Sequence, residues 1–77
     1  SGELARKVAV AVSRLRGLDL EKRPGIAETI DWARALAVLG ANGLDPEAVD
    51  DTLGSVVKDH DDLMLVRDRV AEVIGDG

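Results

Sequence analysis

The residues most able to do chemistry are Arg23-Pro24-Gly25, directly before an apolar helical segment. The free N–H groups of a helix's first turn and the helix dipole favour an anion, and Arg23 adds a fixed positive charge. Gly25 and Glu28 also fit a capping box, in which the Glu28 side chain accepts a hydrogen bond from the Gly25 amide. The two interpretations, a capping turn and a phosphate contact, are compatible with each other.

A second polar group surrounds the single histidine, in the run Lys58-Asp59-His60-Asp61-Asp62. A calcium loop of the EF-hand type needs oxygen ligands at alternate positions, a glycine at the sixth position and a distal glutamate, and this run breaks that pattern. Zinc would need further histidines or cysteines, which the chain lacks. We therefore expect a capping turn at the start of a last helix and no metal site.

The sequence gives little support for a catalytic nucleophile or for a general acid–base pair. Ser13, Thr52 and Ser55 have no histidine at helical spacing and no sequence typical of an oxyanion hole nearby. Glu28 and Asp31 lie three residues apart on a helix, but nothing indicates the dry pocket that would separate their pKa values. We expect no catalytic residue within this chain.

The composition limits the classes of function. The chain has 77 residues, a net charge of −5 and no cysteine, which fits one domain with a small core. The negative charge argues against nucleic-acid binding, because phosphate backbones are contacted through basic surfaces. No apolar run approaches the ~18 residues of a membrane span, and the chain does not start like a signal peptide. We expect a cytoplasmic location, with no nucleic acid and no membrane as partner.

The charges are unevenly distributed along the chain. The charged residues in the range 45–62 are acidic apart from Lys58, whereas basic residues are frequent in the first 34 positions. Those basic residues are Arg6, Lys7, Arg14, Arg16, Lys22, Arg23 and Arg34. The pattern fits either complementary solvated surfaces within one bundle or a basic edge directed at an anionic partner. The location of these residues in the fold distinguishes the two.

Apolar residues recur at helical spacing, and no segment shows sustained alternation typical of a strand. Gly17 and Gly40 are placed to end helices, and Asp45-Pro46 supplies an N-cap followed by a proline tolerated at the first helical position. Gly54 inside the third segment suggests a close helix crossing. The helices are expected at about residues 3–16, 26–39, 46–58 and 61–74. The predicted fold class is all-α, a small four-helix bundle in a single domain, 1–77.

The second helix is the most apolar. Ile26, Ile30, Ala33 and Ala37 share one face, which Trp32, Leu36 and Leu39 widen to roughly half the circumference. This profile predicts a central helix that is contacted on several sides. Trp32, the sole aromatic residue, is expected to lie in the core with its indole N–H donated to a backbone carbonyl or water.

Three motifs of the chain are similar to motifs of a known family. The most specific is the block Pro24-Gly25-Ile26-Ala27-Glu28-Thr29-Ile30-Asp31-Trp32-Ala33, and the others are Leu44-Asp45-Pro46-Glu47 and Thr52-Leu53-Gly54. With the residues around them, they resemble the C-terminal part of MoxR-type AAA+ ATPases, in the branch associated with carbon monoxide dehydrogenase maturation. The resemblance covers most of residues 4 to 60. It implies that the chain is the helical lid of a larger ATPase, without its α/β nucleotide-binding core.

The resemblance also implies a nucleotide-facing site. In AAA+ proteins the lid packs against the bound nucleotide and a neighbouring ring subunit, and a sensor-2 arginine near the start of a lid helix approaches the phosphates. Ile26 stands roughly where related MoxR proteins carry that arginine, so the role falls to Arg23 first and to Lys22 as the alternative. The implied site residues are Arg23, Pro24 and Gly25, and the implied cofactor of the full-length protein is ATP with magnesium. No phosphate-binding loop or acidic strand end of the Walker type occurs in the chain, so the fragment alone should not hydrolyse ATP.

The implied partners are the missing α/β ATPase core, neighbouring ring subunits and a von Willebrand factor A domain protein, in a chaperone-like motor for metalloenzyme maturation. The alternative is a free-standing acidic helical adaptor that binds another protein through apolar residues outside the inner stripe of the last helix, Met64 and Leu65. A helix-turn-helix module is disfavoured, because there is no basic recognition helix.

Overall fold

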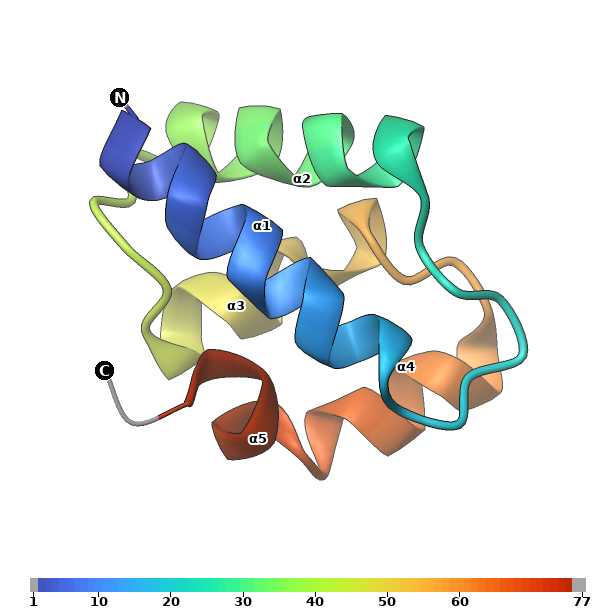
Figure 1. Ribbon diagram of the computed structural model, residues 1–77. Helices are drawn as coiled ribbons and strands as arrows, with labels where there is room; N and C mark the ends of the chain where they lie inside the picture. The colour runs from blue at the N-terminus through green and yellow to red at the C-terminus, as the bar shows by residue number, and fades with distance from the viewer. Residues whose placement is uncertain (1, 76–77) are drawn as a thin grey trace.

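The computed structural model describes residues 2–75; residues 1, 76 and 77 of the predicted domain lie outside the described part. The described chain is entirely helical, as predicted, and its helices enclose one core (Figure 1). In chain order the elements are α1 (Gly2–Arg16), α2 (Ile26–Leu39), α3 (Pro46–Thr52), the 3₁₀ turn η1 (Leu53–Ser55), α4 (His60–Arg67) and α5 (Val70–Ile74). In Figure 1, α2 runs along the top edge, α1 crosses in front of α3, and α4 and α5 lie at the bottom. None of the helices formed by residues 2–75 is long and apolar enough to cross a membrane.

The core is built around Trp32, which is completely buried. Its indole Nε1–H donates to the hydroxyl of Thr52 at 2.8 Å, and that hydroxyl donates to the carbonyl of Ala48 at 2.7 Å. The core position of Trp32 is therefore confirmed, but its partner is a side-chain hydroxyl rather than a backbone carbonyl or water. This hydrogen bond fastens α2 to α3 inside the core, where an unpaired indole N–H would be costly.

The predicted helix ends are largely confirmed. Gly40 ends α2 in the left-handed conformation, with φ 80°, and its amide donates to the carbonyl of Ala37 at 3.0 Å. Asp45 caps α3 by accepting from the amide of Ala48 at 2.8 Å, and Pro46 is the first helical residue. Asp59 caps α4 in the same way. Local side-chain chemistry therefore determines where these helices begin and end.

The third predicted helix, 46–58, is too long. The α-helix ends at Thr52, and η1 follows to Ser55. Val56 and Val57 are adjacent in the chain and both are buried, which the chain achieves by leaving the helix before them. Gly54 is exposed, and a Cβ atom added to it would meet nothing within 4 Å. The expected close helix crossing at Gly54 is wrong.

The fourth predicted helix, 61–74, is broken into α4 and α5 at Asp68 and Arg69. The break lets α5 turn back against α1 and α3, so that Val66 and Val73 are both completely buried. The guanidinium of Arg14 on α1 donates to the carbonyls of Val73 at 3.2 Å and Ile74 at 2.7 Å. These bonds satisfy carbonyls at the C-terminal end of a helix that is too short to be stable alone.

The prediction that α2 is surrounded is also wrong. Only Trp32 and Leu36 of this helix are fully buried, whereas Ile26 is 82% exposed and Val38 90% exposed. Ile30 and Leu39 are about half exposed, at 47% and 49%. The physical reason is the position of α2 at the edge of the molecule, where α1, α3 and η1 pack against one side of it (Figure 1). Half of its apolar circumference is left facing solvent.

Candidate functional site

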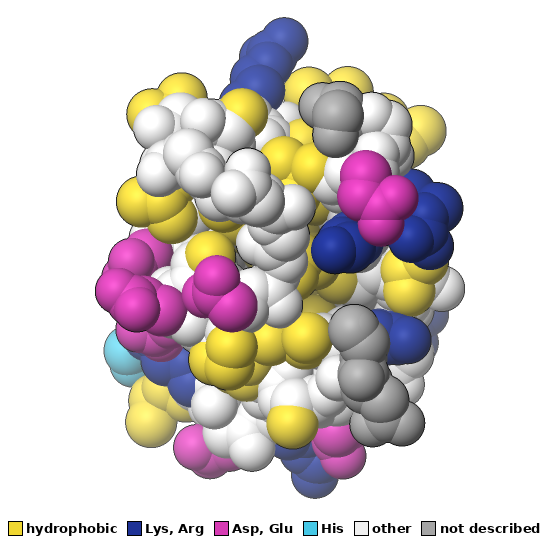
Figure 2. Space-filling model, turned by 90° about the vertical axis from the view of Figure 1, so that its left-hand side faces the viewer, with side chains coloured by type: hydrophobic (Ala, Val, Ile, Leu, Met, Phe, Trp, Pro, Cys, Tyr) yellow, Lys and Arg dark blue, Asp and Glu magenta, His cyan; other side chains and the backbone are white. Residues whose placement is uncertain are grey.

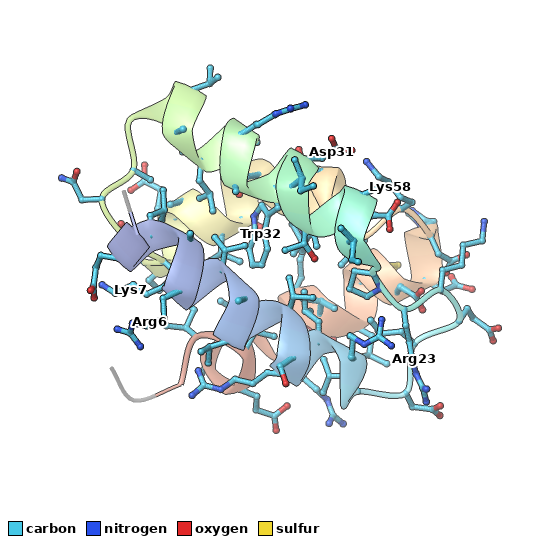
Figure 3. The ribbon with its side chains drawn as sticks, turned by 45° about the horizontal axis from the view of Figure 1, so that its top comes forward. Arg6, Lys7, Arg23, Asp31, Trp32 and Lys58 are labelled. Carbon is cyan, nitrogen blue, oxygen red and sulfur yellow. The ribbon has the colours of Figure 1, made fainter. Side chains whose placement is uncertain are left out.

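Two of the three predicted site residues, Arg23 and Pro24, line a basic cleft of about 240 Å³ beside the start of α2, and Gly25 is not part of its lining. Its walls come from three parts of the chain: the connection before α2, the first turn of α2 and the segment that follows η1. The lining residues are Lys22, Arg23, Pro24, Glu28, Val56 and Lys58. Figure 3 shows Arg23 and Lys58 on opposite sides of the first turn of α2. The fold thus brings three cations and one carboxylate around a helix start.

The three cations of the cleft are available to a ligand. Lys22, Arg23 and Lys58 are all exposed, and none of them takes part in the ion pairs formed among residues 2–75. Lys22 and Arg23 are neighbours in the chain, whereas Lys58 reaches the cleft from the other wall. Unpaired cations that share one cleft make a local positive potential on a chain whose net charge is −5.

The first turn of α2 is capped by the chain itself, as predicted. The Gly25 amide donates to Glu28 Oε1 at 2.8 Å, and the Thr29 hydroxyl donates to the Gly25 carbonyl at 2.7 Å. The first helical backbone bond runs from the Thr29 amide to the Gly25 carbonyl at 3.0 Å, so the amides of residues 26–28 have no partner within the helix. Glu28 satisfies only the Gly25 amide, and the remaining N–H groups still favour an anion.

The other two predicted residues contribute shape. The Pro24 side chain is fully buried, and its carbonyl accepts a hydrogen bond from Arg16 Nη1 at 2.8 Å. Gly25 has an extended backbone, with φ −105° and ψ −160°. A Cβ atom at Gly25 would stand 3.3 Å from the Glu28 carboxylate, so the glycine leaves room for the cap. Of the predicted set, Arg23 alone presents a charge to the cleft.

A buried carboxylate, Asp62, holds the connection that carries Lys22 and Arg23. Asp62 is only 3% exposed, and its two oxygens accept from the amides of Glu21 and Lys22, each at 2.9 Å. Leu20, 8% exposed, fixes the same connection to the core. The backbone of this connection is therefore held by buried groups and does not depend on a ligand for its shape.

Reasoning from the sequence missed two residues of this site. The sequence distinguishes Lys58 only as the single base in an acidic stretch, and that isolation is a usable signal. Asp62 fits a capping run, and nothing in its spacing indicates that it accepts bonds from residues 41 and 40 positions earlier. The fold alone brings it there.

A larger cleft of about 310 Å³ lies between α1, the connection after α2 and the end of α5. It has an apolar floor of Val10, Leu44 and Ile74 and is lined by Arg6, Lys7 and Arg14. Figure 2 shows this side of the molecule, with apolar side chains between basic and acidic ones. Arg6 and Lys7 pair with exposed Glu3 at 3.1 and 3.9 Å. The basic residues of the first 34 positions are therefore divided between two clefts and the outer side of α2, apart from Arg16, which donates to the Pro24 carbonyl, and they form no single basic edge.

Within residues 2–75 no group of three or more metal-ligating side chains comes together. Thr52, one of the candidate nucleophiles, uses its hydroxyl in the core hydrogen bonds with Trp32 and Ala48. The geometry describes an all-helical domain with a small basic cleft at a helix start. Comparison of the chain with models of protein families, with curated proteins and with solved structures gives no match.

Proposed function

We propose that the chain is the helical lid subdomain of a MoxR-type AAA+ ATPase, which closes over the nucleotide and contacts neighbouring ring subunits in a chaperone-like motor for metalloenzyme maturation. The observation that supports this proposal most directly is the basic cleft beside the start of α2. It lies at the helix start within the motif block on which the resemblance rests.

The residues of the cleft fit the phosphates of a nucleotide. Arg23 and the two lysines supply positive charge, and beside the cleft the amides of residues 26–28, which have no partner within the helix, would supply hydrogen-bond donors. Glu28 is the one acidic residue in the lining, and the Gly25 amide already donates to it. In the full-length protein, ATP with magnesium would be held mainly by the α/β core. On this chain, Arg23 would contact the terminal phosphates.

The preceding connection would give Arg23 its role as a sensor. Asp62, Leu20 and the bond from Arg16 to the Pro24 carbonyl fix the backbone on which Arg23 stands. A cation that is held near the transferred phosphate stabilises the charge that develops there. Because the helix and its connection move together, closure of the lid would bring Arg23 to the nucleotide and opening would remove it.

The first test is the open reading frame that encodes this chain together with the ATPase activity of its product. We expect a phosphate-binding loop of the Walker type upstream, and we expect Arg23→Ala to lower the rate of ATP hydrolysis by the full-length protein roughly 10- to 1000-fold. Arg69→Ala is the matched control, because Arg69 is exposed, lies outside the cleft and, within residues 2–75, forms an ion pair only with exposed Glu72. A reading frame without such a loop, or phosphate release by the 77-residue chain alone, contradicts the proposal.

A second candidate function, a helical adaptor, is favoured by the exposed apolar side chains. Met64 is 56% exposed on α4, and the exposed face of α2 adds Ile26 and Val38. Leu65 is partly buried against the core, so it contributes less than expected. A complete reading frame that begins just before this chain would favour the adaptor.

A further inference from the structure

The outer side of α2 is a row of residues at helical spacing that no other element covers. Ile26, Ile30, Arg34 and Val38 follow one another at intervals of four, and we call them the α2 outer row. All four are exposed, Ile26 and Val38 at 82% and 90%. In Figure 1 no other element lies above α2 along its length. A row at this spacing is one of the ridges through which helices pack against each other.

Two charges on the same side have no ion-pair partner among the described residues. Asp31 and Arg34 are exposed, and neither takes part in an ion pair among residues 2–75. In Figure 3, Asp31 lies on the side of α2 away from Trp32. The neighbouring Ala27 and Ala37 are small and also exposed, so a second helix can approach closely.

The order of these residues is complementary to itself. In an antiparallel pair of α2 helices centred on position 32, Ile26 meets Val38 of the second copy and Ile30 lies beside Arg34. Arg34 then comes within one residue of the position opposite Asp31 of the second copy. Two-fold symmetry repeats every contact, so both charges of both copies are paired and each Ile26 faces a Val38.

We propose that the α2 outer row is the interface of an antiparallel homodimer, in which Arg34 of each copy pairs with Asp31 of the other. The inference does not rest on the proposed ATPase function, because neither charge lines the basic cleft. One helix face is smaller than the ~800 Å² per partner of a standard stable interface. We therefore expect a weak dimer of the 77-residue chain, with Kd on the order of 100 µM.

Sedimentation equilibrium from about 10 µM to 1 mM tests the proposal. Asp31→Arg or Arg34→Asp alone turns two attractions into two repulsions and should raise Kd at least about tenfold. The double variant Asp31→Arg with Arg34→Asp restores opposite charges and should return Kd to within about threefold of the original chain. Asp19→Arg is the matched control: it makes the same change of charge at an exposed position in the connection before α2, and Kd should not change.

Far-ultraviolet circular dichroism of each variant shows whether it is folded, and we expect all of them to be folded because every altered side chain is exposed. A chain that stays monomeric up to 1 mM overturns the proposal and leaves the α2 outer row to another protein or domain. The proposal is also overturned if the single charge reversals leave Kd unchanged, or if the double reversal does not restore it. In either case the copies would meet through a different surface or register.

Discussion

At the scale of single residues, Asp62 shows how one buried carboxylate organises a surface site. Both of its oxygens accept backbone hydrogen bonds from the connection that carries Lys22 and Arg23. At the same time its own amide donates to Asp59, which caps α4. Asp62 therefore links the start of one helix to the approach of another, and its contribution comes from hydrogen bonds rather than from an ion pair.

Replacement of Asp62 should test this directly. Asp62→Ala removes the acceptor of two part-buried hydrogen bonds, from the amides of Glu21 and Lys22 to a charged group, so we expect the free energy of unfolding to fall by about 2–4 kcal/mol. Urea denaturation followed by circular dichroism measures the change. Asp61→Ala, at the exposed neighbouring position, should cost less than about 0.5 kcal/mol. Equal effects of the two variants would mean that the Asp62 bonds contribute little.

At the scale of elements, the helix ends agree with local chemistry, and the helix interiors depend on the whole fold. Asp45, Asp59 and Gly40 act where their residue types predict. The break at Asp68 and Arg69 contains no glycine or proline from which it could be predicted. It occurs because α5 must turn to bury Val73, and that requirement comes from the position of α1 rather than from any residue near the break.

Two glycines give a matched prediction at this scale. Gly40 has φ 80°, so Gly40→Ala forces a side chain into the left-handed region and should lower the free energy of unfolding by about 1–2 kcal/mol. Gly54 has no positive φ and open space around it, so Gly54→Ala should be neutral or raise stability by up to about 1 kcal/mol. Thermal and urea unfolding measure both. A Gly54→Ala variant that loses stability would indicate a contact at this position that the structure lacks.

At the scale of the whole molecule, the exposed side of α2 is not a sign of loose packing. The radius of gyration is 11.0 Å, close to the ~11.5 Å expected for a folded domain of this length. Periodicity identified which segments are helical, and Trp32 was correctly placed in the core. It could not distinguish a surrounded helix from one with a second apolar side, because Ile26 and Leu36 look alike in sequence while only one faces the core. For the same reason the sequence around Arg23 identifies it as a candidate site residue, whereas the place of Lys58 and Asp62 at the same site is visible only in the folded chain.

A single core also predicts cooperative unfolding. Trp32 is the only tryptophan and is completely buried, so its fluorescence reports on the core, whereas circular dichroism reports on all helices. In urea the two signals should give one transition with the same midpoint. Separate midpoints would show that part of the bundle, such as α4 with α5, unfolds independently of the Trp32 core.

The bonds of Asp62 have a consequence for recognition at the cleft. Lys58 directly precedes the N-cap of α4. The Lys22 amide donates a hydrogen bond to the carboxylate of Asp62, which is itself a residue of α4. The segment with Lys58 and the connection with Lys22 and Arg23 are thus attached to the same short helix, which sets the separation of their backbones. Under the proposed function, anion binding at the cleft would then require ordering of a few flexible side chains but no rearrangement of the main chain. Such preorganisation would lower the entropic cost of association.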